Sequence, residues 1–167
     1  MLVDETATNE YAVEKPTQKG EIVLNQRMRS TASNGADHGP NPYVTNISRE
    51  TLSNPNYRKT IWTGEHLQST VMSIPPGGEI GLEVHLDTDQ FLRVESGFGV
   101  AMMGPTQNNL NYRQPVRNDV AIFVPAGTWH NVVNTGRIPL KLYSIYAPPH
   151  HPHGTVQKTK AQADAEE

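Results

Sequence analysis

Short runs of β-branched, aliphatic and aromatic residues alternate with turn residues from Asn41 to Ala147. The runs are Thr60–Trp62, Leu67–Ile74, Gly81–His85, Phe91–Val94, Gly99–Met103, Val120–Val124, Asn131–Val133 and Leu140–Tyr146. Turn signals such as Pro75-Pro76-Gly77-Gly78 and Pro125-Ala126-Gly127 separate them. Many short strands with regular turn signals predict an all-β sandwich or barrel. One short helix, Ser48–Leu52, is expected to begin at its serine as N-cap.

The two ends of the chain lack this pattern. Residues 1–40 mix polar and charged side chains without a sustained period, so we expect a mostly mobile N-terminal arm. The run Glu21–Leu24 leaves an alternative open, an edge strand of the barrel or of a partner subunit. Residues 150–167 read as a His/Pro segment and a polar C-terminal tail, which forms a frayed helix or no structure. The barrel is therefore placed at 41–149.

Composition limits the function classes. With 167 residues there is enough chain for one ordinary domain. The 14 basic and 17 acidic residues leave a formal charge of −3, so we expect no nucleic-acid or membrane partner. No apolar run approaches the length that spans a membrane, and residues 1–5 lack the pattern of a signal peptide, which favours a cytoplasmic protein. Cysteine is absent, so a metal site is limited to histidine, carboxylate and amide ligands.

Two spaced motifs carry the candidate chemistry. In the first motif, Gly77 is followed after five residues by Glu83, and His85 comes two positions later. Four residues then lead to Gln90, and six more lead to Gly97. Acidic, imidazole and amide side chains are thus concentrated in one short part of the chain.

The second motif consists of Pro125, Gly127, His130 and Asn134. Together the two motifs resemble those of the cupin superfamily, in the same order and with the same spacing, which is a specific signal. The resemblance covers about Tyr43–Ala147 and implies a double-stranded β-helix, the jelly-roll barrel of that family. It also implies a homodimer, because cupins commonly pair.

Glu83 and Gln90 depart from the family pattern, which has histidine and glutamate at these positions. Because side chains two apart on a strand share a face, Glu83 and His85 both point into the barrel. With Gln90 and His130 from other strands they form a candidate site for one divalent transition metal ion, Zn, Mn, Fe, Ni or Co. The alternative is that the histidines are hydrogen-bonded core residues and that a slip of one residue turns Glu83 to solvent.

The same alternation predicts the wall of a pocket. Residues with the inward parity of the candidate ligands are Leu92, Val94, Val132 and Asn134. Trp129 should face away from the site, on the outside of the barrel or in a dimer interface. An inner wall that is largely apolar suits a small-molecule ligand.

A histidine cluster follows the last predicted strand, at His150, His151 and His153. These residues suit a second metal site, or a lid that carries an acid or base to the barrel mouth. The prolines around them favour a simpler interpretation, a solvent-exposed segment.

Three functions remain open at this point, and no catalytic residue is assigned. The chain looks like small bacterial cupins labelled mannose-6-phosphate isomerase-like, which implies a sugar isomerase acting at the metal. Glu83, His85 and His130 also make up the two-histidine, one-carboxylate set of many non-haem oxygenases, so a metal-dependent dioxygenase is the alternative to the isomerase. The third function is a small-molecule binding or sensing module without turnover.

Overall fold

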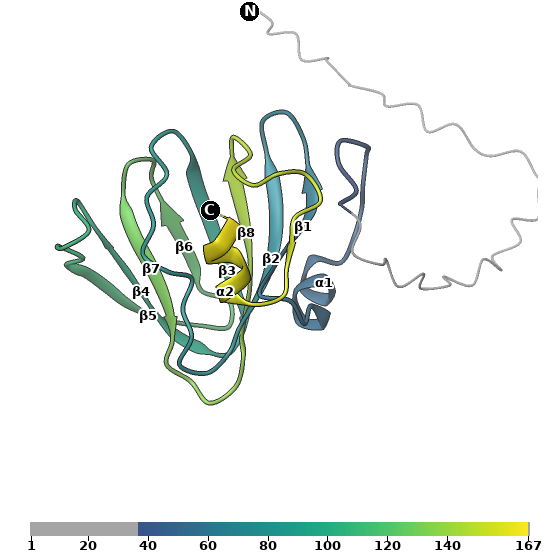
Figure 1. The fold of residues 1–167 in the computed structure, drawn as a ribbon. Helices are drawn as coiled ribbons and strands as arrows, with labels where there is room; N and C mark the ends of the chain where they lie inside the picture. Colours follow the sequence, from purple (N-terminus) through teal and green to yellow (C-terminus); the bar gives the residue numbers. More distant parts are fainter. Residues whose placement is uncertain (1–36, 167) are drawn as a thin grey trace, which may run out of the picture. The chain divides into compact units, whose positions relative to one another are not determined.

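The computed structural model describes residues 37–166, which form a β-structure of two facing sheets (Figure 1). The predicted all-β class is confirmed. The predicted arm lies almost wholly outside the described residues, as does the alternative strand at Glu21–Leu24. None of the helices within 37–166 is long and apolar enough to cross a membrane.

The described part of the chain holds nine strands and two helices. They are α1 Ile47–Ser53, β1 Arg58–Thr63, β2 Gln68–Ile74, β3 Asp89–Ser96, β4 Phe98–Gly104, β5 Tyr112–Arg117, β6 Ala121–Val124, β7 Trp129–Asn134, β8 Leu140–Ala147, β9 Val156–Gln157 and α2 Lys160–Glu166. The larger sheet has the order β6-β3-β8-β2-β1-β9, and the smaller sheet has the order β5-β4-β7. Neighbouring strands in the list are antiparallel.

The core lies between the two sheets and follows the predicted alternation. Leu92 and Val94 of β3 and Val132 of β7 are at most 1% exposed, as their inward parity requires. Asn134 also points inward, and its Nδ2 donates to the carbonyl oxygens of Ile74 and Ile138 at 2.8 and 2.9 Å. This asparagine therefore ties the ends of two loops together in the buried interior.

Two strands differ from the sequence prediction. Residues 81–85 form no regular strand, but run beside β7 through the isolated antiparallel bridges Glu79–Val133 and Glu83–His130. β5 was missed because it is an edge strand with mostly exposed residues and contains Pro115, so it lacks the apolar alternation that marks a strand.

Helix α1 confirms the predicted short helix but not its cap. The N-cap is Asn46, whose Oδ1 accepts from the Arg49 amide at 2.9 Å. Ser48 lies inside the helix, and its hydroxyl donates to Glu95 Oε2 at 2.8 Å. An asparagine two residues earlier satisfies the free amides that the predicted serine was expected to cap.

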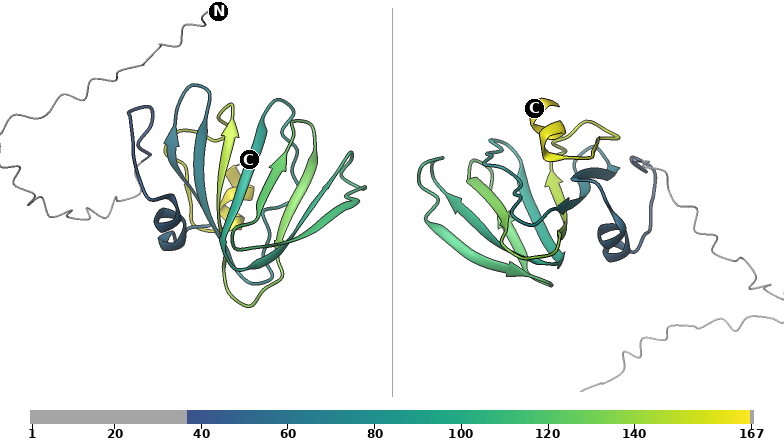
Figure 2. Two further views of the ribbon diagram at one scale, coloured as in Figure 1. Left: turned by 180° about the vertical axis from the view of Figure 1, so that it is seen from behind. Right: turned by 60° about the horizontal axis from the view of Figure 1, so that its bottom comes forward.

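The segment after β8 folds back onto the barrel instead of continuing as a tail. The segment returns to β1, with which its strand β9 pairs, and it ends in α2 (yellow in Figure 2). We call residues 148–157 the strap. Gln68, fully buried on β2, donates from Nε2 to the His151 carbonyl at 2.7 Å and accepts from the His151 amide at 2.9 Å. Ala163 of α2 belongs to the buried core.

The outer face of the larger sheet exposes aromatic side chains. Phe123 of β6 is 70% exposed and its ring lies 5.1 Å from that of Phe91 on β3. With Ile145 and other residues these rings line a groove of about 330 Å³.

The expected homodimer and cytoplasmic location stay predictions.

A substitution at Gln68 tests whether its hydrogen bonds hold the strap in place. Gln68→Leu removes both hydrogen bonds to the His151 backbone and leaves a buried amide and carbonyl unpaired, which should lower the free energy of unfolding by about 2–4 kcal/mol. Urea denaturation measures this loss, and hydrogen exchange should show faster exchange of the strap amides. Ser69→Ala, on the next residue of β2, is the control. Unchanged protection of the strap amides in Gln68→Leu would contradict the inference that Gln68 holds the strap against the barrel.

Candidate metal centre

Backbone pairing brings the first two candidate ligands together. The Glu83 amide donates to the His130 carbonyl at 3.0 Å, and the His130 amide donates to the Glu83 carbonyl at 2.9 Å. The two residues are thus directly opposite each other, where side chains on the same face are neighbours. Gln90 reaches the same place from the middle of the larger sheet, where it pairs with Val124 and Tyr146.

A tight turn holds His85 in place. The Gly127 amide donates to the His85 carbonyl at 2.7 Å, and Gly127 has φ of 76°, a conformation that favours glycine. The neighbouring Ala126 amide donates to Asp89 Oδ1 at 2.9 Å. The proline-glycine turn of the second motif therefore fixes the backbone of a residue from the first motif.

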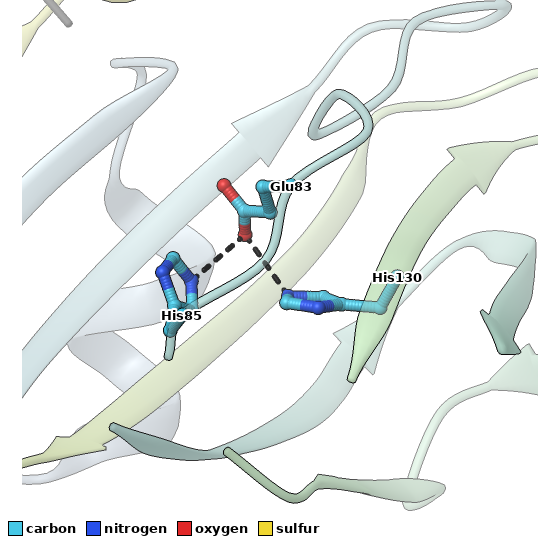
Figure 3. A group of neighbouring side chains, drawn as sticks. All are labelled: Glu83, His85 and His130. Atoms are coloured by element: carbon cyan, nitrogen blue, oxygen red, sulfur yellow. Dashed lines mark hydrogen bonds and ion pairs between the residues drawn. The ribbon is translucent and has the colours of Figure 1, made fainter. Parts of the chain in front are cut away.

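The side chains of Glu83, His85 and His130 converge (Figure 3). Glu83 Oε1 lies 3.2 Å from His130 Nε2 and 3.4 Å from His85 Nε2. One donor atom from each of the three residues lies within 4.8 Å of the others. Gln90 Oε1 lies 2.8 Å from His130 Nε2. All four candidate ligands therefore meet at one place, and both histidines and Gln90 are at most 6% exposed.

Glu83 carries a negative charge at this place. Burial by itself raises the pKa of its carboxyl group, but the hydrogen bonds and charge of His130 and His85 outweigh burial. They hold the pKa of Glu83 well below its usual range. At neutral pH this side chain is a carboxylate that only accepts hydrogen bonds.

The hydrogen-bond partners of His130 require a positive centre at the site. Its Nδ1 lies 2.9 Å from the Thr128 carbonyl, which can only accept, so Nδ1 carries a proton. Its Nε2 faces two oxygens, Glu83 Oε1 and Gln90 Oε1. Either a second proton or a metal ion must lie between Nε2 and these acceptors. A carbonyl partner at Nδ1 is also the arrangement that orients metal-binding histidines.

His85 supplies a second observation in favour of a metal ion. Its Nε2 is buried, and its contact with Glu83 Oε1 at 3.4 Å is too long or too poorly aligned for a well-formed hydrogen bond. A buried polar atom without a partner costs about 1–3 kcal/mol unless an ion or water satisfies it. The donor set, two imidazoles, a carboxylate and an amide oxygen, fits a divalent transition metal ion.

The candidate centre lies in the wall of a pocket of about 540 Å³. The residues around this pocket are Leu82, Glu83, Val84, His85, Trp129, His150, His151, Pro152, Thr155, Gln157 and Glu166. Trp129, the first residue of β7, also lines this pocket. That its side chain faces away from the candidate ligands stays a prediction.

The histidine cluster divides between two places. The His150 ring lies 4.0 Å from the His85 ring, centroid to centroid, and His151 also lines the pocket. His153 lies elsewhere, with Nε2 donating to the Gly39 carbonyl at 3.0 Å. The expected solvent-exposed segment thus supplies part of the pocket wall. Spacing alone could not reveal this, because it depends on the fold of the strap.

His151 is held neutral. Burial and the nearby positive charge of Arg58 lower the pKa of its imidazole to about 3. In the unfolded chain the same group takes up a proton near pH 6.5. Between these two values the unfolded state binds more protons than the folded state, so stability falls as the pH is lowered from about 6.5.

This difference predicts the effect of one substitution. His151→Gln should flatten the fall in the free energy of unfolding between pH 6.5 and pH 4, by at most about 1.4 kcal/mol per pH unit. Denaturation with urea at several pH values measures the slope. His66→Gln is the control, because the His66 side chain is 86% exposed. The same slope in His151→Gln and in the unchanged protein would show that His151 is not buried in its neutral form.

Comparison with known proteins identifies the family. The family model described as "Cupin domain" matches residues 70–146. The uncharacterized protein YrkC of Bacillus subtilis is 57% identical over 131 residues, which cover 78% of this chain and 70% of that protein. BH2720 from Bacillus halodurans, known from a crystal structure, has 61% sequence identity to this chain and superposes with a TM-score of 0.77. The match covers 78% of this chain and 98% of that chain. A Klebsiella pneumoniae protein with a double-stranded β-helix domain shares the fold alone, with 19% identity and a TM-score of 0.54 over 71% of this chain and 100% of that chain. The domain match and these relatives agree with the double-stranded β-helix predicted from the sequence, and the chain belongs to the cupin family.

Proposed function

We propose that the protein binds one divalent transition metal ion through Glu83, His85 and His130, and that it acts on a small molecule in the adjoining pocket. The observation that carries this proposal is the orientation of His130, whose Nε2 faces two oxygen acceptors. Gln90 is the fourth ligand through its Oε1. The buried Nε2 of His85, which makes only a loose 3.4 Å contact with Glu83 Oε1, supports the same conclusion.

Each residue has a separate part in holding the ion. The Thr128 carbonyl fixes the ring orientation of His130 through Nδ1 at 2.9 Å. Glu83 adds one negative charge, which favours harder divalent ions than an all-histidine set does. When bound, such an ion supplies Lewis acidity and open positions for the oxygen atoms of a ligand.

The reaction class that we propose first is an oxygen-dependent one, a metal-dependent dioxygenase. Two histidines and one carboxylate with open positions are the ligand set of many non-haem Fe(II) oxygenases. The pocket walls at Leu82, Val84 and Trp129 are apolar, which suits an organic substrate.

A sugar isomerase is the second candidate. The imidazoles of His150 and His151 line the pocket, and an imidazole can move a proton between neighbouring carbons. A phosphorylated sugar is the less favoured substrate, because none of the described residues that line the pocket is Lys or Arg.

The metal proposal predicts about one ion per chain. Elemental analysis of protein purified without chelator should show it, and the double variant His85→Ala/His130→Ala should lose it while its circular dichroism stays unchanged. Adding metal after dialysis should raise the melting temperature of the unchanged protein but not of the variant. His66→Ala, at an exposed histidine, should bind as the unchanged protein does. Unchanged protein that neither contains nor takes up metal would contradict the proposal.

The reaction class is tested by oxygen uptake. The Fe(II)-loaded protein should consume oxygen with small diketones or phenols, whereas the Zn(II)-loaded protein should not, because Zn(II) has no redox chemistry. Glu83→Ala should lower this rate by about 100-fold, since even residues that only support a metal ligand typically contribute about 10–100-fold. Interconversion of unphosphorylated aldoses and ketoses without oxygen uptake would favour the isomerase instead.

A further inference from the structure

A second carboxylate lines the same pocket as the candidate metal centre. It belongs to Glu166 of α2, and it is exposed at the pocket rim. Its Oε1 accepts from Gln162 Nε2 at 2.9 Å, and its Oε2 accepts from Gln157 Nε2 at 3.0 Å. These hydrogen bonds lower the pKa of Glu166 below its ordinary value, so it is ionised at neutral pH. Each carboxylate oxygen keeps a free acceptor site for a further donor.

The position of this carboxylate is fixed from the interior of the protein. Gln157 of β9 is 3% exposed, and its Oε1 accepts from Nη1 of the fully buried Arg58 at 3.0 Å. A guanidinium group only donates, so the Gln157 amide must present its oxygen to Arg58 and its nitrogen to Glu166. Glu166 therefore has a preorganised orientation, which a free surface glutamate does not have.

The charges around the pocket give the ligand a preferred polarity. The described lining residues include two carboxylates, Glu83 and Glu166, and none of them is Lys or Arg. Burial keeps His151 neutral. A divalent ion exceeds the single negative charge of Glu83 by one in the proposed function. The Glu166 carboxylate balances this remaining charge, and it places negative charge and hydrogen-bond acceptors at the rim of the pocket.

We infer that the small molecule binds the metal with oxygen atoms at one end and donates a hydrogen bond to Glu166 from the other end. This inference rests on the proposed metal centre and adds the substrate class. The donor is an ammonium or hydroxyl group, and a phosphate or carboxylate at that end is disfavoured. Thr155 and His150 also line the pocket that such a ligand would enter.

Three matched hydroxamates test the inference. β-Alanine hydroxamate, butyrohydroxamate and succinic monohydroxamate share the metal-chelating group and the carbon chain, and they end in an ammonium, a methyl and a carboxylate. Titration calorimetry with the Ni(II)-loaded protein should give about threefold tighter binding for the ammonium probe than for the methyl probe. The carboxylate probe should bind about threefold more weakly than the methyl probe. Both differences in affinity should shrink as salt is added.

One variant assigns the preference to Glu166. Glu166→Gln keeps the size and one acceptor, and it should make the ammonium and methyl probes bind equally. Glu65→Gln is the matched control, because it makes the same change of charge at a side chain that is 86% exposed and does not line the pocket. It should keep the preference of the unchanged protein.

The outcomes separate the two proposals. If the metal-loaded protein does not bind even butyrohydroxamate, the proposed metal function fails and the inference fails with it. If butyrohydroxamate binds but the ammonium probe has no advantage, only the inference is overturned. The inference is also overturned if the ammonium probe still binds Glu166→Gln more tightly than the methyl probe does, because the ammonium group then contacts a residue other than Glu166.

Discussion

The site depends on a conflict between hydrogen-bond acceptors. The Thr128 carbonyl accepts a hydrogen bond from His130 Nδ1–H, and this leaves Nε2 facing Glu83 Oε1 and Gln90 Oε1. Three electron-rich atoms in a buried place repel one another unless positive charge lies between them. Because paired backbone amides fix Glu83 opposite His130, the side chains cannot simply move apart. The fold thus maintains a place where a cation lowers the free energy.

The second half of the pocket depends on a different part of the chain. Gln68 binds both backbone groups of His151, and β9 extends the sheet at β1, so the strap and α2 are held against the barrel. The candidate metal ligands come from the motif segments, whereas His150, Gln157 and Glu166 come from the C-terminal segment. The candidate centre and the pocket rim thus come from separate segments of the chain, an arrangement that lets one fold carry different functional sites.

Sequence reasoning predicted what depends on local periodicity and spacing. Alternation on β3 and β7 placed Leu92 and Val132 in the core, and motif spacing selected the four residues that the structure brings together. It could not predict β9 or the pocket position of Glu166, because both depend on a long return of the chain that leaves no periodic signal. The cap at Asn46 was missed because Ser48 offered an equally good pattern two residues later.

Charge balance connects the two halves of the pocket. A divalent ion brings two positive charges, and the ionised Glu83 and Glu166 bring two negative charges, so the pocket with its ion is formally neutral. A chelating ligand binds best when its oxygens are deprotonated, and this adds a negative charge next to apolar walls. An ammonium group at the far end restores neutrality, whereas a phosphate increases the excess. Since uncompensated charge is costly wherever water is excluded, the histidine-to-glutamate change at Glu83 and the carboxylate at the rim both favour a ligand with opposite charges at its two ends.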